Sequence, residues 1–309
     1  TNPPTINAGH ISNKGVEFML SYNNRVGELK YDITGTMAFN KNLVVDIPNE
    51  EGIIHGPPST LSQGTVEMFR AEEGFPIGYF WGYETDGIFQ DTNEVNAYVN
   101  SAGEPIIRNV VPGDVNFVDV NGSGAISDSD KVMIGNPHPD FVFGLQVNLD
   151  YKGFYFQFTG NGMAGHQVAK SYRSFADSPR HNYTTDVYDR WHGPGTSDKY
   201  PRLYYGTHKN YQWVSDIYIE DADFFRISNI TLGYDLNQLI KGIPFAQTRL
   251  YVAGNNVYTF TKYSGMDPEV GYSPTDDDDP ENDFKWGSGI DLGLYPQPRT
   301  FMVGLSIKF

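Results

Sequence analysis

The stretch Phe301-Met-Val-Gly-Leu-Ser-Ile-Lys-Phe309 decides the fold. Every second residue in it is large and apolar: Phe301, Val303, Leu305, Ile307 and Phe309. Because successive side chains of a strand point to opposite faces, this period of two predicts a strand with one apolar and one polar face. A strand of this kind that ends on an aromatic residue is typical of the closing strand of an outer-membrane β-barrel.

The same period recurs in six further segments. The predicted strands lie near residues 15–23, 29–39, 140–151, 153–162, 223–235, 248–258 and 300–309. Each is close to the roughly 9–11 residues that a tilted strand needs to cross a bilayer. Leu145 is assigned to the lipid face of its strand and Gln146 to the solvated interior. The fold class is therefore predicted to be all-β, a portion of a large transmembrane antiparallel barrel.

A soluble β-sandwich also shows alternating strands, because one face of each sheet packs on a core. Two patterns favour the membrane. Aromatic residues gather at both sets of strand ends, as at the two lipid–water interfaces. The connections alternate between short turns and long loops, which predicts periplasmic turns and a periplasmic C-terminus. Extracellular loops are expected at 40–139, 163–221 and 259–298.

Composition sets broad limits on function. The 309 residues include no cysteine, which excludes disulfides and thiolate metal sites. A net charge of −16 disfavours nucleic-acid binding, which needs a basic surface. No apolar run of about 18 residues predicts a transmembrane helix. Seven strands are an odd number, whereas single-chain bacterial barrels have an even number of strands and at least eight, so other strands are expected to close the sheet.

Several collinear motifs resemble one family. They are Phe75-Pro-Ile-Gly-Tyr-Phe-Trp-Gly-Tyr-Glu-Thr-Asp-Gly-Ile-Phe-Gln90, Pro112-Gly-Asp-Val-Asn-Phe-Val-Asp-Val-Asn-Gly-Ser-Gly124, Ile134-Gly-Asn-Pro-His-Pro-Asp-Phe141, Asp189-Arg-Trp-His-Gly-Pro-Gly-Thr196, Tyr200-Pro-Arg-Leu203, Phe225-Arg-Ile-Ser-Asn-Ile-Thr-Leu-Gly-Tyr234 and Tyr295-Pro-Gln-Pro-Arg-Thr-Phe301. In this order they resemble the C-terminal barrel part of the SusC/RagA-type TonB-dependent outer-membrane transporters of Bacteroidota.

The resemblance implies a barrel of about 22 strands in the cell outer membrane, plugged by an N-terminal domain. The plug, which would contact the TonB complex, is not expected within this chain. The implied function is part of an active importer of glycans or peptides. Its implied partners are a SusD-like surface lipoprotein, the remaining N-terminal barrel and plug, and outer-membrane lipid.

The stretch Asp119-Val-Asn-Gly-Ser-Gly-Ala-Ile-Ser-Asp-Ser-Asp130 is the sharpest chemical motif. It aligns with an EF-hand calcium loop and predicts these ligands: Asp119, Asn121, Ser123, Ala125 through its carbonyl, and Asp130. Position 12 is Asp rather than Glu, which makes bidentate capture less favourable and leaves magnesium open. The alternative is a turn whose Asx and Gly residues satisfy their own backbone.

Aromatic residues of the long loops are candidate contacts for sugar rings or peptide side chains, against the alternative of loop packing: Trp81, Trp191, Tyr204, Tyr205, Trp213 and Trp286. Met266-Asp-Pro-Glu-Val270 is interpreted as loop-shaping, because proline fixes the backbone.

No His-Glu-x-x-His, Gly-x-Ser-x-Gly or phosphate-loop motif occurs, so an enzyme is not expected. The competing functional hypothesis is a secreted or surface-exposed β-rich adhesin or glycan-binding protein with a calcium-stiffened loop.

Overall fold

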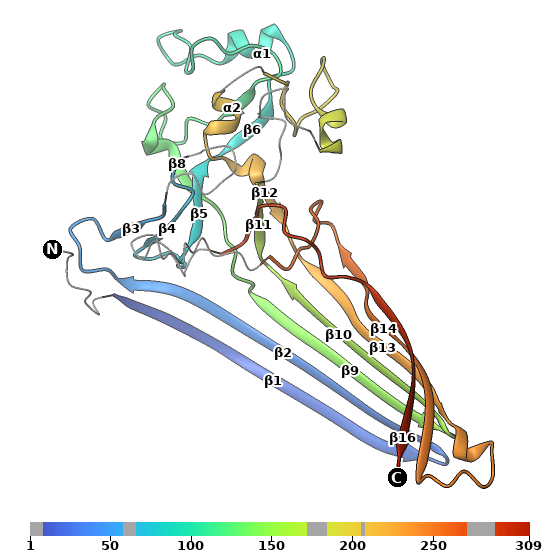
Figure 1. Cartoon of the computed structure of the whole chain (residues 1–309). Coiled ribbons are helices and arrows are strands. Elements are labelled where there is room, and N and C mark those ends of the chain that lie inside the picture. The colour runs from blue at the N-terminus through green and yellow to red at the C-terminus, as the bar shows by residue number, and fades with distance from the viewer. Residues whose placement is uncertain (1–8, 58–65, 172–183, 205–207, 271–287) are drawn as a thin grey trace, which may run out of the picture.

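A computed structural model describes residues 9–57, 66–171, 184–204, 208–270 and 288–309. Its main feature is a seven-stranded antiparallel sheet of order β1-β2-β9-β10-β13-β14-β16 (Figure 1). The seven strands follow one another across the sheet in the order in which they occur in the chain. The strands are β1 (His10–Val26), β2 (Leu29–Asp46), β9 (Phe141–Tyr151), β10 (Phe154–Ala164), β13 (Phe224–Asp235), β14 (Gln247–Thr261) and β16 (Thr300–Lys308).

Each predicted span coincides with one strand of this sheet, although three strands are longer than the alternation indicates. The first begins at His10 and reaches Val26, the second runs on to Asp46, and β14 continues to Thr261. The extensions mix polar and apolar residues and remain paired, as where Asn42 Nδ2 donates to Asn13 Oδ1 over 2.7 Å. Backbone pairing therefore continues past the apolar band, where the sequence no longer alternates.

The register separates the residue types onto two faces. One row across all seven strands is apolar apart from a single glycine: Tyr22, Ile33, Val147, Phe158, Ile230, Gly254 and Phe301. The adjacent row, on the other face, is entirely polar: Ser21, Thr34, Gln146, Thr159, Asn229, Asn255 and Thr300. A sheet with this pattern has an apolar face and a polar face along its whole width.

Short connections lie at one end of the sheet, together with the C-terminus (Figure 1). Lys152 and Gly153 both have positive φ, 49° and 88°, as a two-residue hairpin turn requires. Lys152 Nζ lies 3.0 Å from the Glu28 carboxylate in the neighbouring turn. The two hairpin turns, β1 to β2 and β9 to β10, are therefore tight and are linked by an ion pair.

On the polar face, two glycines accommodate tyrosine rings. A side chain at Gly233 would overlap the ring of Tyr155, and one at Gly304 would overlap the ring of Tyr251. The rings therefore lie across the neighbouring strands, as glycine in a strand permits when another group approaches closely.

The long connections at the other end fold into an outer subdomain of small sheets, where the sequence predicted only loops (Figure 1). Its strands are β3 (Ile53–His55), β4 (Phe69–Glu72), β5 (Tyr79–Tyr83), β6 (Thr85–Ile88), β7 (Val115–Phe117), β8 (Lys131–Gly135), β11 (Gln167–Lys170), β12 (Ile219–Asp221) and β15 (Ile290–Asp291). They order as β3-β4-β5-β8, β12-β11-β15 and β6-β7. These strands are too short to show a clear period, which is why the sequence did not reveal them.

The outer subdomain has its own hydrophobic core. Phe69 and Phe117 come from the first long connection, Val214 from the second and Ile290 from the third, and all are at most 1% exposed. The outer subdomain also contains two short α-helices, α1 (Thr92–Ala97) and α2 (Lys209–Gln212). In the described part of the chain, no helix is long and apolar enough to span a membrane.

Candidate functional site

The Asp119–Asp130 loop folds as a compact turn. Asp119 accepts backbone N–H bonds from Ser123 at 3.0 Å and Gly124 at 2.6 Å. Asp130 is fully buried and accepts from the N–H groups of Asn121 and Ser127. Gly124, at the sixth position of the loop, has a φ of 86°, the sharp-turn conformation that the motif predicts.

The surroundings of Asp130 favour its ionised form. Burial acts to raise the pKa of Asp130, but the hydrogen bonds from Ser127 and Asn121 outweigh it, so its pKa lies below the usual value. Among the described residues, no group of three or more His, Asp or Glu side chains is arranged to hold a metal. The loop offers two carboxylates together with amide, hydroxyl and carbonyl oxygens, which are the ligand types that calcium takes. Calcium binding by this loop stays a prediction.

The aromatic candidates do not converge on one site. Trp81 packs beneath Arg70, whose guanidinium carbon lies 3.7 Å from the centre of the Trp81 ring. Trp213 packs on Tyr83 and Phe117 against the outer core. Trp191 lies against Gly113, where its ring leaves no room for a side chain. These positions are those of packing residues, and their role in cargo binding stays a prediction.

Tyr204 is the most accessible of the described aromatic candidates. It is 41% exposed and lies against His208, with ring centres 4.5 Å apart. Tyr205 and Trp286 lie outside the described residues.

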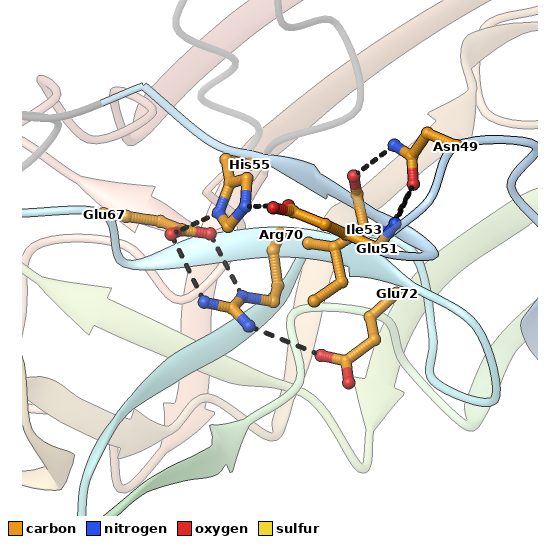
Figure 2. A network of polar contacts seen from close by, with 7 residues as sticks. All are labelled: Asn49, Glu51, Ile53, His55, Glu67, Arg70 and Glu72. Atoms are coloured by element: carbon orange, nitrogen blue, oxygen red, sulfur yellow. Dashed lines mark hydrogen bonds and ion pairs between the residues drawn. The ribbon is translucent and has the colours of Figure 1, made fainter. Parts of the chain in front are cut away.

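A polar network joins strands β3 and β4 (Figure 2). The two ring nitrogens of His55 contact different carboxylates, Glu67 at 2.8 Å and Glu51 at 3.2 Å. Arg70 contacts Glu67 from the other side and lies 3.6 Å from Glu72. Because the two nitrogens point in opposite directions, the arrangement suits a protonated His55 bridging two carboxylates and does not gather ligands around one metal.

This network predicts a pH-dependent hairpin. The hydrogen bond to Glu67 is the main cause that raises the pKa of His55 above its usual value of about 6.5. A raised folded-state pKa stabilises the hairpin below pH 6.5, and the contribution is lost as the pH rises through the folded-state value. We expect amide exchange of residues 51–56, corrected for intrinsic rates, to be slower at pH 5.5 than at pH 8.5.

The variant His55→Gln should lose this pH dependence, whereas His10→Gln, which changes an exposed histidine on β1, should keep it. An unchanged pH profile in His55→Gln would assign the effect to other groups.

A buried carboxylate organises the outer subdomain. Asp114 is 0% exposed, and its Oδ1 accepts from Arg202 Nε at 2.8 Å and from Asn210 Nδ2 at 3.0 Å. Its Oδ2 accepts from the N–H of Val111 at 3.1 Å. One side chain thus joins the first long connection to the second, and the sequence carried no signal for this pairing beyond the Pro-Gly-Asp motif itself.

A hollow of about 670 Å³ opens on the polar face of the sheet. It is lined by the strand residues Asn161, Arg226 and Asn256, and by Asp267 and Tyr295 from the last long connection. The pairing of β13 with β14 shifts between Ile227 and Asn229, and Asn256 opposite has a φ of 50°, which marks a β-bulge. The bulge therefore lies directly beside the hollow.

These features define a class of protein. A wide antiparallel sheet with one apolar and one polar face, tight turns at one end and a folded outer subdomain at the other is a segment of a transmembrane β-barrel wall.

Comparison with known proteins shows which receptors the chain is similar to. The chain is 33% identical to TonB-dependent receptor P3 of Formosa agariphila over 98% of its own length, and 27% identical to the TonB-dependent receptor SusC of Bacteroides thetaiotaomicron over 99%. It is thus similar, over nearly all of its own length, to TonB-dependent receptors, SusC among them. It spans 29% and 27% of the lengths of these two relatives. No protein-family model matches the chain.

The fold agrees with the sequence comparison. The structure of the RagAB peptide transporter superposes with a TM-score of 0.70 at 18% identity, covering 98% of this chain and 30% of that one. The RagAB peptide importer in its open-open state gives a TM-score of 0.68. The predicted resemblance to the SusC/RagA-type transporters and the all-β barrel fold are thereby confirmed.

Proposed function

We propose that this chain forms part of the barrel wall and outer chamber of a TonB-dependent outer-membrane importer of glycans or peptides. The observation that carries the proposal is the pair of adjacent residue rows, one apolar and one polar, that run across all seven strands. A soluble protein would expose the apolar row to water, whereas a membrane barrel turns it to lipid. The sequence relatives are named as receptors, which supports transport rather than enzyme chemistry.

In this proposal the outer subdomain is extracellular, and the short turns and C-terminus are periplasmic. A SusD-like lipoprotein caps the chamber, and energy from the TonB complex enters through the plug, outside this chain. The adhesin alternative has no support among the relatives found.

The proposal is tested by mass spectrometry of the native complex from outer-membrane extract. We expect this segment within, or tightly bound to, a larger barrel-and-plug polypeptide, with a surface lipoprotein present. Recovery of the segment as a soluble monomer would overturn the proposal.

We further propose that the Asp119–Asp130 loop binds calcium as a structural ion, since its donors are all oxygen. Calorimetric titration is expected to show one site that Asp119→Ala abolishes. Asp128→Asn serves as the control, because the Asp128 carboxylate pairs with Lys131 at 2.7 Å and is not among the predicted ligands. Absence of calcium uptake by the unsubstituted protein would contradict the site and leave a self-satisfied turn.

A further inference from the structure

The segment Tyr263–Glu269 is attached to the barrel wall at its Asp267–Glu269 end by one buried cation. Arg226 on β13 is 5% exposed. Its guanidinium donates to Asp267 and, over 2.7 Å, to Glu269, while its Nε donates to Thr259 on β14 over 3.1 Å. Pro268 separates the two carboxylates and restricts the backbone between them. A planar guanidinium suits this arrangement because its several N–H groups engage two acceptors at once.

The same segment is attached on its other side to the outer sheet β12-β11-β15. Ser264 Oγ accepts from Lys170 Nζ at 2.8 Å and donates to Glu220 Oε1 at 2.9 Å. The Ser264 N–H donates to the second oxygen of Glu220 at 3.0 Å. The hydroxyl of Tyr263 donates to Asp291 at 2.8 Å. Each of the three strands thus contributes one side chain.

The charged groups of this second attachment are deeply buried. Lys170 and Asp291 are 1% exposed and Glu220 is 9% exposed. Lys170 also pairs with Asp186, and Glu220 with Lys199. Buried polar groups that satisfy one another are costly to separate, because opening the contact leaves a desolvated charge.

We infer that Tyr263–Glu269 is a polar keystone: it locks the outer sheet β12-β11-β15 to the barrel wall at Arg226, so that wall and outer sheet move as one body. Arg226 and Glu220 are positioning residues at its two ends. This attachment governs rigidity, whichever cargo is transported. Met266-Asp-Pro-Glu-Val270, which the sequence indicates only as loop-shaping, thereby has a structural task.

The keystone predicts that its two ends are energetically coupled. In the complete receptor purified in detergent, we expect Arg226→Gln to accelerate amide exchange at least about tenfold in residues 263–270, and also in 167–170 and 219–221, where no contact to Arg226 is lost directly. Glu220→Gln should accelerate the same three peptides. The double variant should add little to the larger single effect, because either substitution already opens the same unit.

Lys262→Gln is the matched control, since Lys262 is exposed and adjacent in the chain; its exchange should equal that of the unsubstituted protein. The mobility shift between unheated and heated samples on an SDS gel verifies that each barrel is folded. Where Arg226→Gln fails to assemble, Arg226→Lys keeps the charge but offers a single ammonium to two carboxylates, and should give a smaller effect in the same peptides. Exchange that changes only in 267–269, or effects of the two substitutions that add fully, would overturn the keystone.

Discussion

Replacing Leu145 with arginine is expected to cost about 2–4 kcal/mol of barrel stability, the penalty for a cationic side chain near the bilayer midplane. Leu145 lies in the middle of β9, between Gly35 and Gly160 on the neighbouring strands, and belongs to the apolar face. Its side chain would meet lipid on that face. Arginine there must either lose hydration or drag water into the membrane, so the folded, heat-resistant fraction should fall.

The matched control is the next residue. Gln146→Arg places the same side chain on the polar face, in the row with Thr34 and Thr159. It should assemble with near-normal stability, as read from heat-modified electrophoresis and urea unfolding in lipid. Equal behaviour of the two variants would mean that the faces have been assigned the wrong way round or that the sheet does not contact lipid.

Replacing Asp114 with alanine is the second substitution for which we expect a large effect, about 3 kcal/mol lost from the outer subdomain. The substitution leaves the fully buried Asn210 amide and the Val111 N–H without their acceptor, and leaves Arg202 without its counter-ion. The barrel strands should be unaffected, because these three partners of Asp114 all belong to the outer subdomain. Protease resistance of the outer subdomain in the assembled receptor measures the effect.

Asp114→Asn separates charge from hydrogen bonding. An asparagine can still accept from Arg202 through Oδ1 but carries no charge, so we expect a loss smaller than that of alanine. If alanine and asparagine were both harmless, the carboxylate would have no part in holding the first and second long connections together.

The barrel wall could be predicted from the sequence because one physical rule applies along each strand. Lipid on one face and water on the other select a period of two, and that period alone assigns Phe158, Val147 and Ile230 to the same face, where they lie side by side. The strand ends were less predictable: Asn13 and Asn42 are polar yet remain paired, since hydrogen bonding of the backbone continues where side-chain selection by lipid has ceased.

The outer subdomain could not be predicted in the same way. Its contacts join residues far apart in the chain, such as Asp114 with Arg202, and the pair of Arg226 with Asp267 joins the last long connection to the wall. No local periodicity records such pairs. The motif containing Asp267 and Glu269 did carry a signal, two carboxylates around a proline, but a single sequence cannot reveal which cation they meet. The aromatic candidates show the same limit, because Trp213 in a loop has the same local appearance whether it packs on a core or faces cargo.

The composition of the outer core has a consequence for biogenesis. Phe69, Val214 and Ile290 pack in one cluster but are delivered by three different connections, the last of which lies between β14 and β16. Contacts between such distant segments form late, because the chain between them must first be ordered. The outer core therefore closes only after nearly the whole segment has been synthesised and brought together, and an unfinished insertion intermediate would display these aromatic and aliphatic side chains to chaperones and proteases.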